Sequence, residues 1–307
     1  MVKSLTLDTV TEILLKSAAI GGEVCRTQRQ HSSVCFKPSQ EPSTSLVALA
    51  CSIVTSADLI VQETILECLL AKGLEECAIQ AEEDTPSLQR FGGNERLATL
   101  YVDPIDGTLA YSLGCPGWEE QALSAGFGRD VLTNTREGVD QRFYGVVLGA
   151  FVPGSGIAAV CALPELAVTY HGLHGLAFRN GTEVRPPVTS RASRVAIGRR
   201  LLDPNGMTST PFANAGLPIR RFNASSPGVL WQLLEGACTS YAGVNCGYDM
   251  QLASVIASAA GFSASDRHGN ALVPNLAGVV DIVLASSEDE KERICDIMLQ
   301  FERSRSR

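Results

Sequence analysis

The chain has 307 residues, of which 45% are hydrophobic and 19% charged, a composition ordinary for a soluble globular protein with one large domain or two fused layers. Its formal net charge is −8 and no basic face is visible, which argues against binding to a nucleic acid polymer. No apolar run approaches membrane-spanning length, and the N-terminus lacks the continuous apolar core of a signal peptide, so no membrane partner is expected.

In the N-terminal part, the spacing of apolar residues predicts helices over residues 8–30 and 57–72. The segment between them, 31–45, is polar and contains proline, and a loop is expected there. The turn VPGS is typical of a hairpin and joins the last two of the strands that follow. These strands are expected at 97–102, 143–151 and 156–162.

In the C-terminal part, Gly172 and Gly175 indicate turns in a strand pair over 166–178, and a loop over 181–192 leads to a strand at 193–199. The remaining expected elements are helices over 226–237 and 249–260, a strand pair within 262–307 that includes VVDIVLA, and a final helix. This alternation of strands and helices favours a layered α/β or α+β fold.

The cysteines and histidines do not form a recognisable site. The ten cysteines contain no CxxC pair and mostly stand in apolar surroundings, so we expect buried free thiols in a reducing, cytoplasmic environment. The histidines fall outside the acidic motifs described below, and we expect structural or surface roles for them. They are His31, His171, His174 and His268.

The stretch VDPIDGT is the strongest candidate for a functional site. Asp103 follows an apolar strand, and Pro104 bends the chain so that Asp103 and Asp106 can converge. Gly107 allows a close backbone approach, and Thr108 can begin a helix whose free N–H groups suit a phosphate. Two converging carboxylates repel each other unless a cation lies between them, and oxygen ligands suit Mg²⁺. An acidic capping turn is the alternative interpretation of this stretch alone.

Other acidic residues stand at the ends of expected elements. Asp58 begins the second helix, Asp249 lies in the first turn of a later helix, and AEED places Glu82 and Glu83 after a strand. Taken singly, each is ordinary: a helix-start charge, an N-cap or a solvated acidic turn. Their combination with VDPIDGT is what makes them candidates.

Taken together, these stretches resemble the inositol monophosphatase superfamily of Mg²⁺-dependent, lithium-sensitive phosphatases. VDPIDGT resembles the superfamily signature D-P-[IL]-D-G-T, VTSAD its T-x-x-D element and AEED its G-E-E-[SD] element. SAAIGGEVCR resembles the first helix, and the segment from RRFNASSPG to DMQLASVIASAAG resembles the C-terminal half. These five elements occur in the family's order and cover nearly the whole chain.

The resemblance implies a layered αβαβα sandwich in two parts. Residues 1–165 would form an N-terminal α+β part carrying most metal ligands. Residues 166–307 would form a C-terminal α/β part carrying the substrate pocket and the last metal ligand. Relatives of this kind act as monomers or homodimers, and the partner would be a small anionic phosphorylated substrate.

The resemblance also implies a set of metal ligands. Glu82, Asp103 and the carbonyl of Ile105 would hold a first Mg²⁺. Asp103, Asp106 and Asp249 would hold a second, and a third, weaker ion would bind through Glu82. Lithium would inhibit by replacing the second Mg²⁺ at Asp106 and Asp249.

Catalytic and substrate-binding roles carry over in the same way. Asp58 and Thr108 would orient and polarise an attacking water, and Glu82 is counted with them as catalytic. Phosphate would be lost by direct in-line hydrolysis without a phosphoenzyme. Glu83 would support the ligands, and the backbone of Gly107 and Thr108 would cradle the phosphate. Ser225 and Ser226 would line the substrate pocket. Arg220, with Arg221, would contact a second phosphate. Plain N-capping is the alternative for the two serines, and a solvated basic pair is the alternative for the two arginines.

The substrate signals point in several directions. The short interval from Glu82 to Asp103 is similar to simple inositol monophosphatases, but their inositol-contacting glutamate falls at Ala242. ADLIVQETI resembles inositol polyphosphate 1-phosphatase, whereas LLEG and HGN resemble 3′(2′),5′-bisphosphate nucleotidase. The Lys-Trp pair usual in both groups is replaced by Gly247 and Tyr248.

We expect an inositol polyphosphate first, then a nucleoside bisphosphate, then inositol monophosphate. A fructose bisphosphate is a further alternative within the superfamily. A relative that binds metal and phosphate without catalysis is the alternative from a different class.

Overall fold

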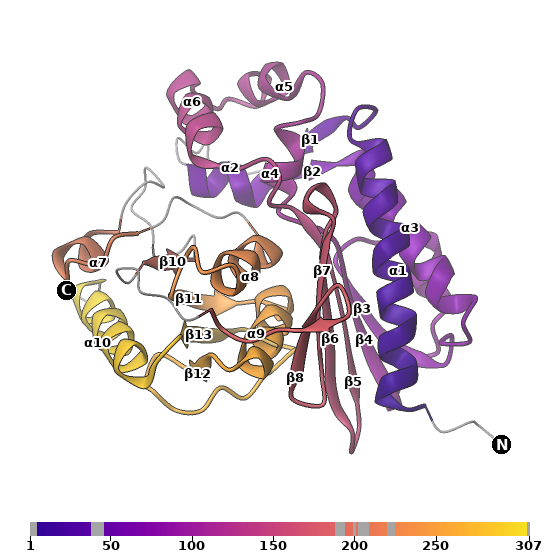
Figure 1. Ribbon diagram of the computed structural model, residues 1–307. Helices are drawn as coiled ribbons and strands as arrows, with labels where there is room; N and C mark the ends of the chain where they lie inside the picture. The colour runs from indigo at the N-terminus through magenta and orange to yellow at the C-terminus, as the bar shows by residue number, and fades with distance from the viewer. Residues whose placement is uncertain are drawn as a thin grey trace.

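Two large β-sheets alternate with three helical layers in the computed structural model (Figure 1). The structure describes residues 5–37, 46–187, 194–198, 201, 209–219 and 225–305. The layers follow in the order helix, sheet, helix, sheet, helix, so the expected αβαβα sandwich is confirmed.

The first helical layer covers one face of a seven-stranded sheet. It contains α1 (Leu7–Gln28) and α3 (Ser56–Leu70), which agree with the helices predicted over 8–30 and 57–72. In the sheet, β3 and β4 are parallel and each later neighbour is antiparallel. Its strands, in both chain and spatial order, are β3 (Cys77–Ala81), β4 (Asn94–Asp106), β5 (Gly145–Val152), β6 (Gly156–Leu163), β7 (Val168–Leu173), β8 (Leu176–Arg179) and β9 (Thr182–Glu183).

Strands β7 to β9 lie beyond residue 165 yet belong to this first sheet. The division of the chain at residue 165 therefore remains a prediction, and the sheet itself continues to Glu183. The strand pair predicted over 166–178 is β7 with β8. The loop predicted over 181–192 is corrected at its start, because residues 182–183 pair with β8 as β9.

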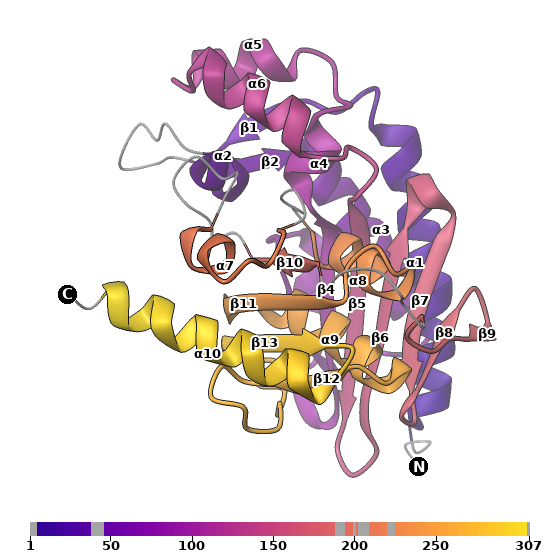
Figure 2. The same cartoon turned by 60° about the vertical axis from the view of Figure 1, so that its left-hand side comes forward.

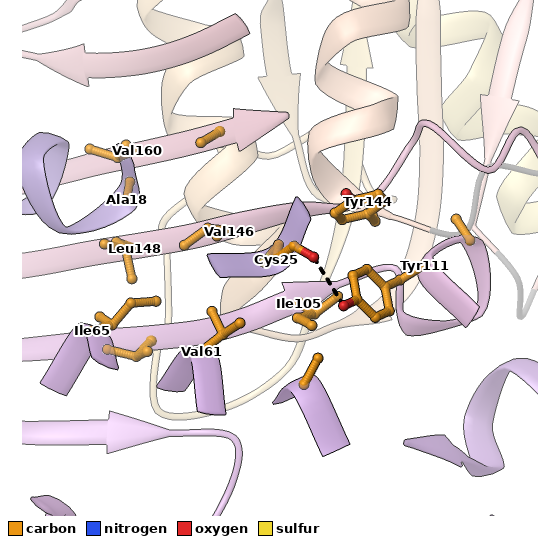
Figure 3. Close-up of a cluster of buried hydrophobic side chains, with 14 of the residues drawn as sticks. Ala18, Cys25, Val61, Ile65, Ile105, Tyr111, Tyr144, Val146, Leu148 and Val160 are labelled. Carbon is orange, nitrogen blue, oxygen red and sulfur yellow. Dashed lines mark hydrogen bonds between the residues drawn. The ribbon is translucent and has the colours of Figure 1, made fainter. Parts of the chain in front are cut away.

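Tight apolar packing joins α1, α3 and the sheet (Figure 3). Val61 and Ile65 of α3 lie in the same buried cluster as Val146 and Leu148 of β5. A Cβ at Gly21 of α1 would lie 2.8 Å from the Ile65 Cδ1 atom, so a side chain at this position would force Ile65 or the helix to shift. This layer fixes β4, and through it the stretch VDPIDGT.

The middle helical layer lies between the two sheets and contains α8 (Ser226–Leu234) and α9 (Tyr248–Ala260). Helix α9 packs against both sheets, so it is apolar around most of its circumference rather than along one stripe. Both helices were predicted from the sequence, α8 with three residues too many at its C-terminal end.

The second sheet has four strands and is covered on its outer side by α7 (Thr210–Asn214) and α10 (Glu288–Arg305) (Figure 2). The strand predicted at 193–199 is β10, and VVDIVLA contributes β13, which pairs antiparallel with β12. The strand order is β10 (Val195–Ile197), β11 (Ser240–Cys246), β13 (Val280–Ala285) and β12 (Ser263–Ser265).

A cap of short elements lies at one end of the seven-stranded sheet (Figure 1). It corrects the loop predicted over 31–45, because residues 34–36 form a strand, β1, that pairs with β2. Helices α2, α5 and α6 were not predicted from the sequence. The cap consists of β1 (Val34–Phe36), α2 (Leu46–Ser52), β2 (Ile53–Thr55), α4 (Thr108–Ser112), α5 (Trp118–Ser124) and α6 (Arg129–Gly138).

The structure describes all ten cysteines, and each is a free thiol. Seven are buried as expected, but Cys35 and Cys51 are exposed and Cys68 is half-buried. Within the described ranges, no helix combines the length and the apolar character that crossing a membrane would require. The cytoplasmic location stays a prediction.

Candidate active site

The stretch VDPIDGT forms the end of β4 and the start of α4. Its pairing with β5 becomes irregular between Asp103 and Asp106, and Pro104 lies in this irregular segment, where a strand tolerates proline. Asp103 and Asp106 are each only 8% exposed. Both nevertheless line one cavity of about 420 Å³.

Two further predicted carboxylates line the same cavity. Glu82 follows β3, and the parallel pairing of β3 with β4 brings it beside Asp103, with its N–H donating to the Val102 carbonyl at 3.2 Å. Asp249 reaches the cavity from the first turn of α9, which belongs to the middle layer. The cavity thus gathers acidic residues from three segments that are distant in sequence.

Burial and mutual repulsion dominate the electrostatics of these groups. The pKa values of Asp103 and Asp106 are raised well above the usual range, first by burial and then by the neighbouring carboxylates. The pKa of Glu82 is raised mainly because the surrounding protein desolvates it. Such a cluster is unfavourable when fully ionised unless a cation compensates it.

Ser226 links two of the carboxylates. Its N–H donates to Asp106 Oδ2 at 2.8 Å, and its hydroxyl donates to Asp249 Oδ2 at 2.8 Å. Ser226 lines the cavity, and this bridge between two carboxylates was not predicted from the sequence. Ser225 lines the cavity too and is the N-cap of α8: it accepts from the Gly228 N–H at 3.0 Å.

The donor set fits a hard divalent cation. Asp103 Oδ1 is buried and has no hydrogen-bond partner, an arrangement that a bound ion would relieve. The other candidate donors are carboxylate oxygens and the carbonyl of Ile105, the oxygen chemistry that Mg²⁺ prefers. In the described part of the chain, no three Asp, Glu, His or Cys side chains form a closed ligand cluster.

Gly107 makes the turn from β4 into α4 possible. Its φ of 92° lies in the left-handed region, and a Cβ there would lie 2.7 Å from the Ser225 Cβ. Thr108 then begins α4, and its hydroxyl lies 3.0 Å from the Ile105 carbonyl and 3.3 Å from Asp58 Oδ1. Gly107 and Thr108 both line the cavity, as predicted.

Asp58 combines a structural role with a contact to the site. Its Oδ2 atom accepts from the N–H and the hydroxyl of Thr55 at 2.8 and 2.6 Å, which caps α3. Its Oδ1 atom faces the Thr108 hydroxyl. Asp58 is buried, and this burial raises its pKa to about 7 despite the hydrogen bonds. The helix-start interpretation of Asp58 is confirmed by its bonds to Thr55, and its functional role stays a prediction.

Two residues beside the acidic cluster were not predicted. Lys37 lines the cavity, and its Nζ atom lies 3.7 Å from Glu83 Oε1. Gln62 of α3 accepts from the Glu83 N–H at 2.9 Å, so Glu83 lies against the cluster without lining the cavity. Lys37 is the sole lysine or arginine among the lining residues that the structure describes.

The predicted substrate positions have mixed outcomes. Arg220 and Arg221 lie outside the described residues. Ala242 is buried and does not line the cavity, whereas Tyr241 beside it does. Tyr248 also lines the cavity, and its hydroxyl donates to the Val102 carbonyl at 2.9 Å.

Comparison with known proteins gives a family and a set of similar structures. A family model described as "Inositol monophosphatase family" matches residues 6–301. The chain belongs to the inositol monophosphatase family. Its members are phosphatases that depend on Mg²⁺ and act on small phosphorylated substrates, and the present protein is accordingly a phosphoric monoester hydrolase.

Solved structures with little sequence identity share the fold of this phosphatase. The extragenic suppressor protein SuhB from Bartonella henselae is 17% identical, with a TM-score of 0.69 over 94% of this chain and 97% of that one. An IMPase/NADP phosphatase solved with NADP and Ca²⁺ is 15% identical, with a TM-score of 0.67 over 96% and 97%.

A Staphylococcal inositol monophosphatase-1 in a LiCl-soaked inhibitory complex is also 15% identical, with a TM-score of 0.67 over 96% of each chain. A search of curated proteins found no match. At these identities the similar structures establish the fold, while the substrate has to be argued from the chain itself.

Proposed function

We propose that this phosphatase removes one phosphate from a small polyphosphorylated metabolite at the cavity described above. The observation that carries the proposal is the buried, unpartnered Asp103 Oδ1 atom in a cavity lined by three further carboxylates. A purely structural acidic turn would keep such an atom hydrogen-bonded or solvated.

The metal ligands follow the family pattern. Glu82, Asp103 and the Ile105 carbonyl would hold one Mg²⁺. Asp103, Asp106 and Asp249 would hold another, and Glu82 a weaker third. The bridge through Ser226 supports the pairing of Asp106 with Asp249, because one residue orients both carboxylates. When bound, Mg²⁺ supplies charge neutralisation for the phosphate and lowers the pKa of a water molecule.

The chain's own residues would orient that water and the phosphate. Thr108 donates toward Asp58, and Asp58 is itself fixed by its capping bonds to Thr55, so the pair can hold a water in one orientation. Glu83, anchored by Gln62 and close to Lys37, would support the ligand Glu82 beside it. The backbone N–H groups of Gly107 and Thr108 would bind phosphate oxygens.

An inositol polyphosphate cleaved by a 1-phosphatase reaction is the first candidate substrate. Besides the sequence elements already given, Lys37 supports it, because a second phosphate needs a cation and Lys37, beside Glu83, is the sole lysine or arginine among the described lining residues. Arg220 and Arg221 would add to this positive charge. The burial of Ala242 outside the cavity argues against inositol monophosphate, since no acidic side chain takes the place of the inositol-contacting glutamate there.

A 3′(2′),5′-bisphosphate nucleoside is the second candidate. Cys51, Val244 and Val279 also line the cavity and offer apolar contacts that suit a nucleobase better than a polyol. The similar IMPase/NADP phosphatase, solved with NADP, shows that a protein of this fold binds a nucleotide.

The test is Mg²⁺-dependent phosphate release, measured in parallel on inositol 1,4-bisphosphate, adenosine 3′,5′-bisphosphate, inositol 1-phosphate and fructose 1,6-bisphosphate. A clear preference for the first supports the proposal, and a preference for the second replaces its substrate. Millimolar Li⁺ should inhibit. No release from any of the four would favour a binding protein, and a trapped phosphoenzyme would overturn direct hydrolysis.

A further inference from the structure

Arg29 follows α1 directly and carries a buried guanidinium group that reaches into the cap. Its Nε atom donates to the Tyr111 carbonyl at 2.9 Å, and Nη2 donates to the Ala110 carbonyl at 2.9 Å. Nη2 also donates to the Gln141 carbonyl at 2.9 Å, and Nη1 pairs with Glu165 at 3.1 Å. Each guanidinium nitrogen therefore has a partner, and most partners are backbone carbonyls.

Two of these carbonyls, those of Ala110 and Tyr111, belong to the end of the helix that begins in the active site. Helix α4 has five residues: Thr108 begins it at the cavity, and the Ala110 and Tyr111 carbonyls lie in its last turn. Carbonyls in the last turn of a helix lack partners within that helix, and a cation there is favourable. A helix of five residues has little stability of its own. Contacts at its two ends therefore determine where it lies.

The surroundings of Arg29 fit a planar guanidinium. A Cβ at Gly114 would lie 2.2 Å from Arg29 Nε, so only a glycine leaves room for the group. The Tyr144 ring centroid lies 4.9 Å from Arg29 Cζ, and the Tyr144 hydroxyl donates to Glu165 at 2.9 Å.

A second contact joins the same two helices. The Tyr111 hydroxyl donates to the Cys25 carbonyl at 3.0 Å (Figure 3). The end of α1 therefore contacts α4 twice, once through the Arg29 side chain and once through the Tyr111 side chain. Lysine could not reproduce the Arg29 contacts, since it carries a single nitrogen and no planar fork.

We propose that Arg29 is a positioning residue for catalysis: by holding the end of α4, it sets the Thr108 hydroxyl against Asp58. The inference rests on the proposed function, in which Thr108 and Asp58 orient the attacking water. Arg29 is not among the residues that line the cavity, and its hydrogen bonds to α4 are its link to Thr108. Its contacts to Gln141 and Glu165 fix the same guanidinium group from outside α4. A merely stabilising residue would lower the unfolding temperature without acting through Thr108.

The experiment uses two variants that disturb this contact differently. Arg29→Lys keeps the charge but loses the fork, and Gly114→Ala keeps the arginine but displaces it. Arg26→Gln is the matched control, because Arg26 lies in the last turn of α1, just before Arg29, but pairs with Glu23 on the surface. For each variant we would measure thermal unfolding, and kcat and KM with Mg²⁺ present. Amide hydrogen exchange of residues 108–112 is measured in the metal-free protein. The kcat values are measured again with each substitution in a Thr108→Val background.

We expect Arg29→Lys and Gly114→Ala to lower kcat roughly tenfold to a hundredfold, as an ångström-scale displacement does, with a smaller change in KM. In the Thr108→Val background the same substitutions should lower kcat by less than about twofold, because the group they act through is gone. Exchange in α4 should rise in both variants and not in Arg26→Gln. Folded variants with wild-type kcat, or equal losses in both backgrounds, would overturn the inference.

The exchange measurement separates this inference from the proposed function. Suppose that the wild type releases no phosphate while exchange in α4 rises in the variants as expected. The proposed function is then wrong, and so is the catalytic role of Arg29, but its contact still fixes the position of α4. If exchange is unchanged in both variants, the hold itself is refuted whatever the activity.

Discussion

Asp106 is the residue on which the two-metal proposal can be tested most directly. It is buried, it accepts from the Ser226 N–H, and the charges nearest to it include another carboxylate, that of Asp249. Its ionised form is therefore costly in the metal-free protein and useful only when a cation is present. Substitution by asparagine removes the charge and keeps the shape of the side chain.

We predict that Asp106→Asn lowers kcat/KM by on the order of a hundredfold or more, because a metal ion contributes several kcal/mol to charge stabilisation. The metal-free variant should unfold at the same temperature as the wild type or higher, since a repelling charge is gone. Phosphate release and thermal unfolding check both parts. Asp140→Asn, which removes a half-buried carboxylate paired with Arg142 outside the cavity, is the control and should leave activity unchanged. A folded Asp106→Asn enzyme with full activity would exclude Asp106 as a ligand.

Single residues also show how far sequence reasoning reaches. Asp58, Asp103 and Asp106 could be found because a short motif places each at the end of an element. The role of Ser226 could not, because it bonds an aspartate 120 positions earlier in the chain, and no local pattern encodes that contact. The same holds for Lys37, which is an ordinary loop lysine in the sequence and a cavity residue in the fold.

At the level of elements, helices with strong apolar patterns were predicted well and the cap was not. Helix α9 was predicted within one residue, since it is apolar on all sides and ends at a glycine with φ of 110°. Helix α6 has the sequence RDVLTNTREG, rich in residues with weak helix propensity, and is held by packing within the cap. Tertiary contacts decide such segments, so the sequence alone does not.

Helix α2 is the cap element that a ligand should affect. Cys51 of α2 is exposed and lines the cavity, whereas Cys35 of β1 is exposed and does not. We predict that saturating adenosine 3′,5′-bisphosphate or inositol 1,4-bisphosphate, whichever is the substrate, slows alkylation of Cys51 several-fold, because the bound molecule occupies the space beside the thiol.

Peptide mass spectrometry after timed iodoacetamide labelling measures the two rates, with Ca²⁺ in place of Mg²⁺ to limit turnover. Alkylation of Cys35 should be unchanged and serves as the internal control. Inorganic phosphate alone should protect Cys51 little, as it reaches only the acidic end of the cavity. Equal protection of both thiols, or none at saturation, would show that the ligand does not extend to α2.

At the scale of the whole molecule, the acidic cluster joins two layers. Glu82, Asp103 and Asp106 come from the first sheet and its end, and Asp249 comes from the middle helical layer. Without a cation, the ionised cluster pushes these layers apart, and a shared ion would hold them together. Stability should therefore depend on pH and on Mg²⁺ jointly.

The direction follows from the raised pKa values. Because Asp58, Asp103, Asp106 and Glu82 hold their protons more tightly when folded, their contribution to stability is complete below their unfolded pKa values near 4. It is lost as pH rises through the folded values, which for Asp58 is about 7. In EDTA, the unfolding temperature should therefore fall between pH 5 and pH 8 by more in the wild type than in Asp58→Asn.

Magnesium should reverse this loss, because ions bind the ionised carboxylates and stabilise the folded state by mass action. We predict that 5 mM Mg²⁺ raises the unfolding temperature of the wild type more at pH 8 than at pH 5, and that Asp106→Asn reduces the rise at pH 8. Differential scanning calorimetry at the two pH values, with and without Mg²⁺, measures both. An equal Mg²⁺ effect at both pH values, or one unaffected by Asp106→Asn, would mean that the ion binds elsewhere than between the two layers.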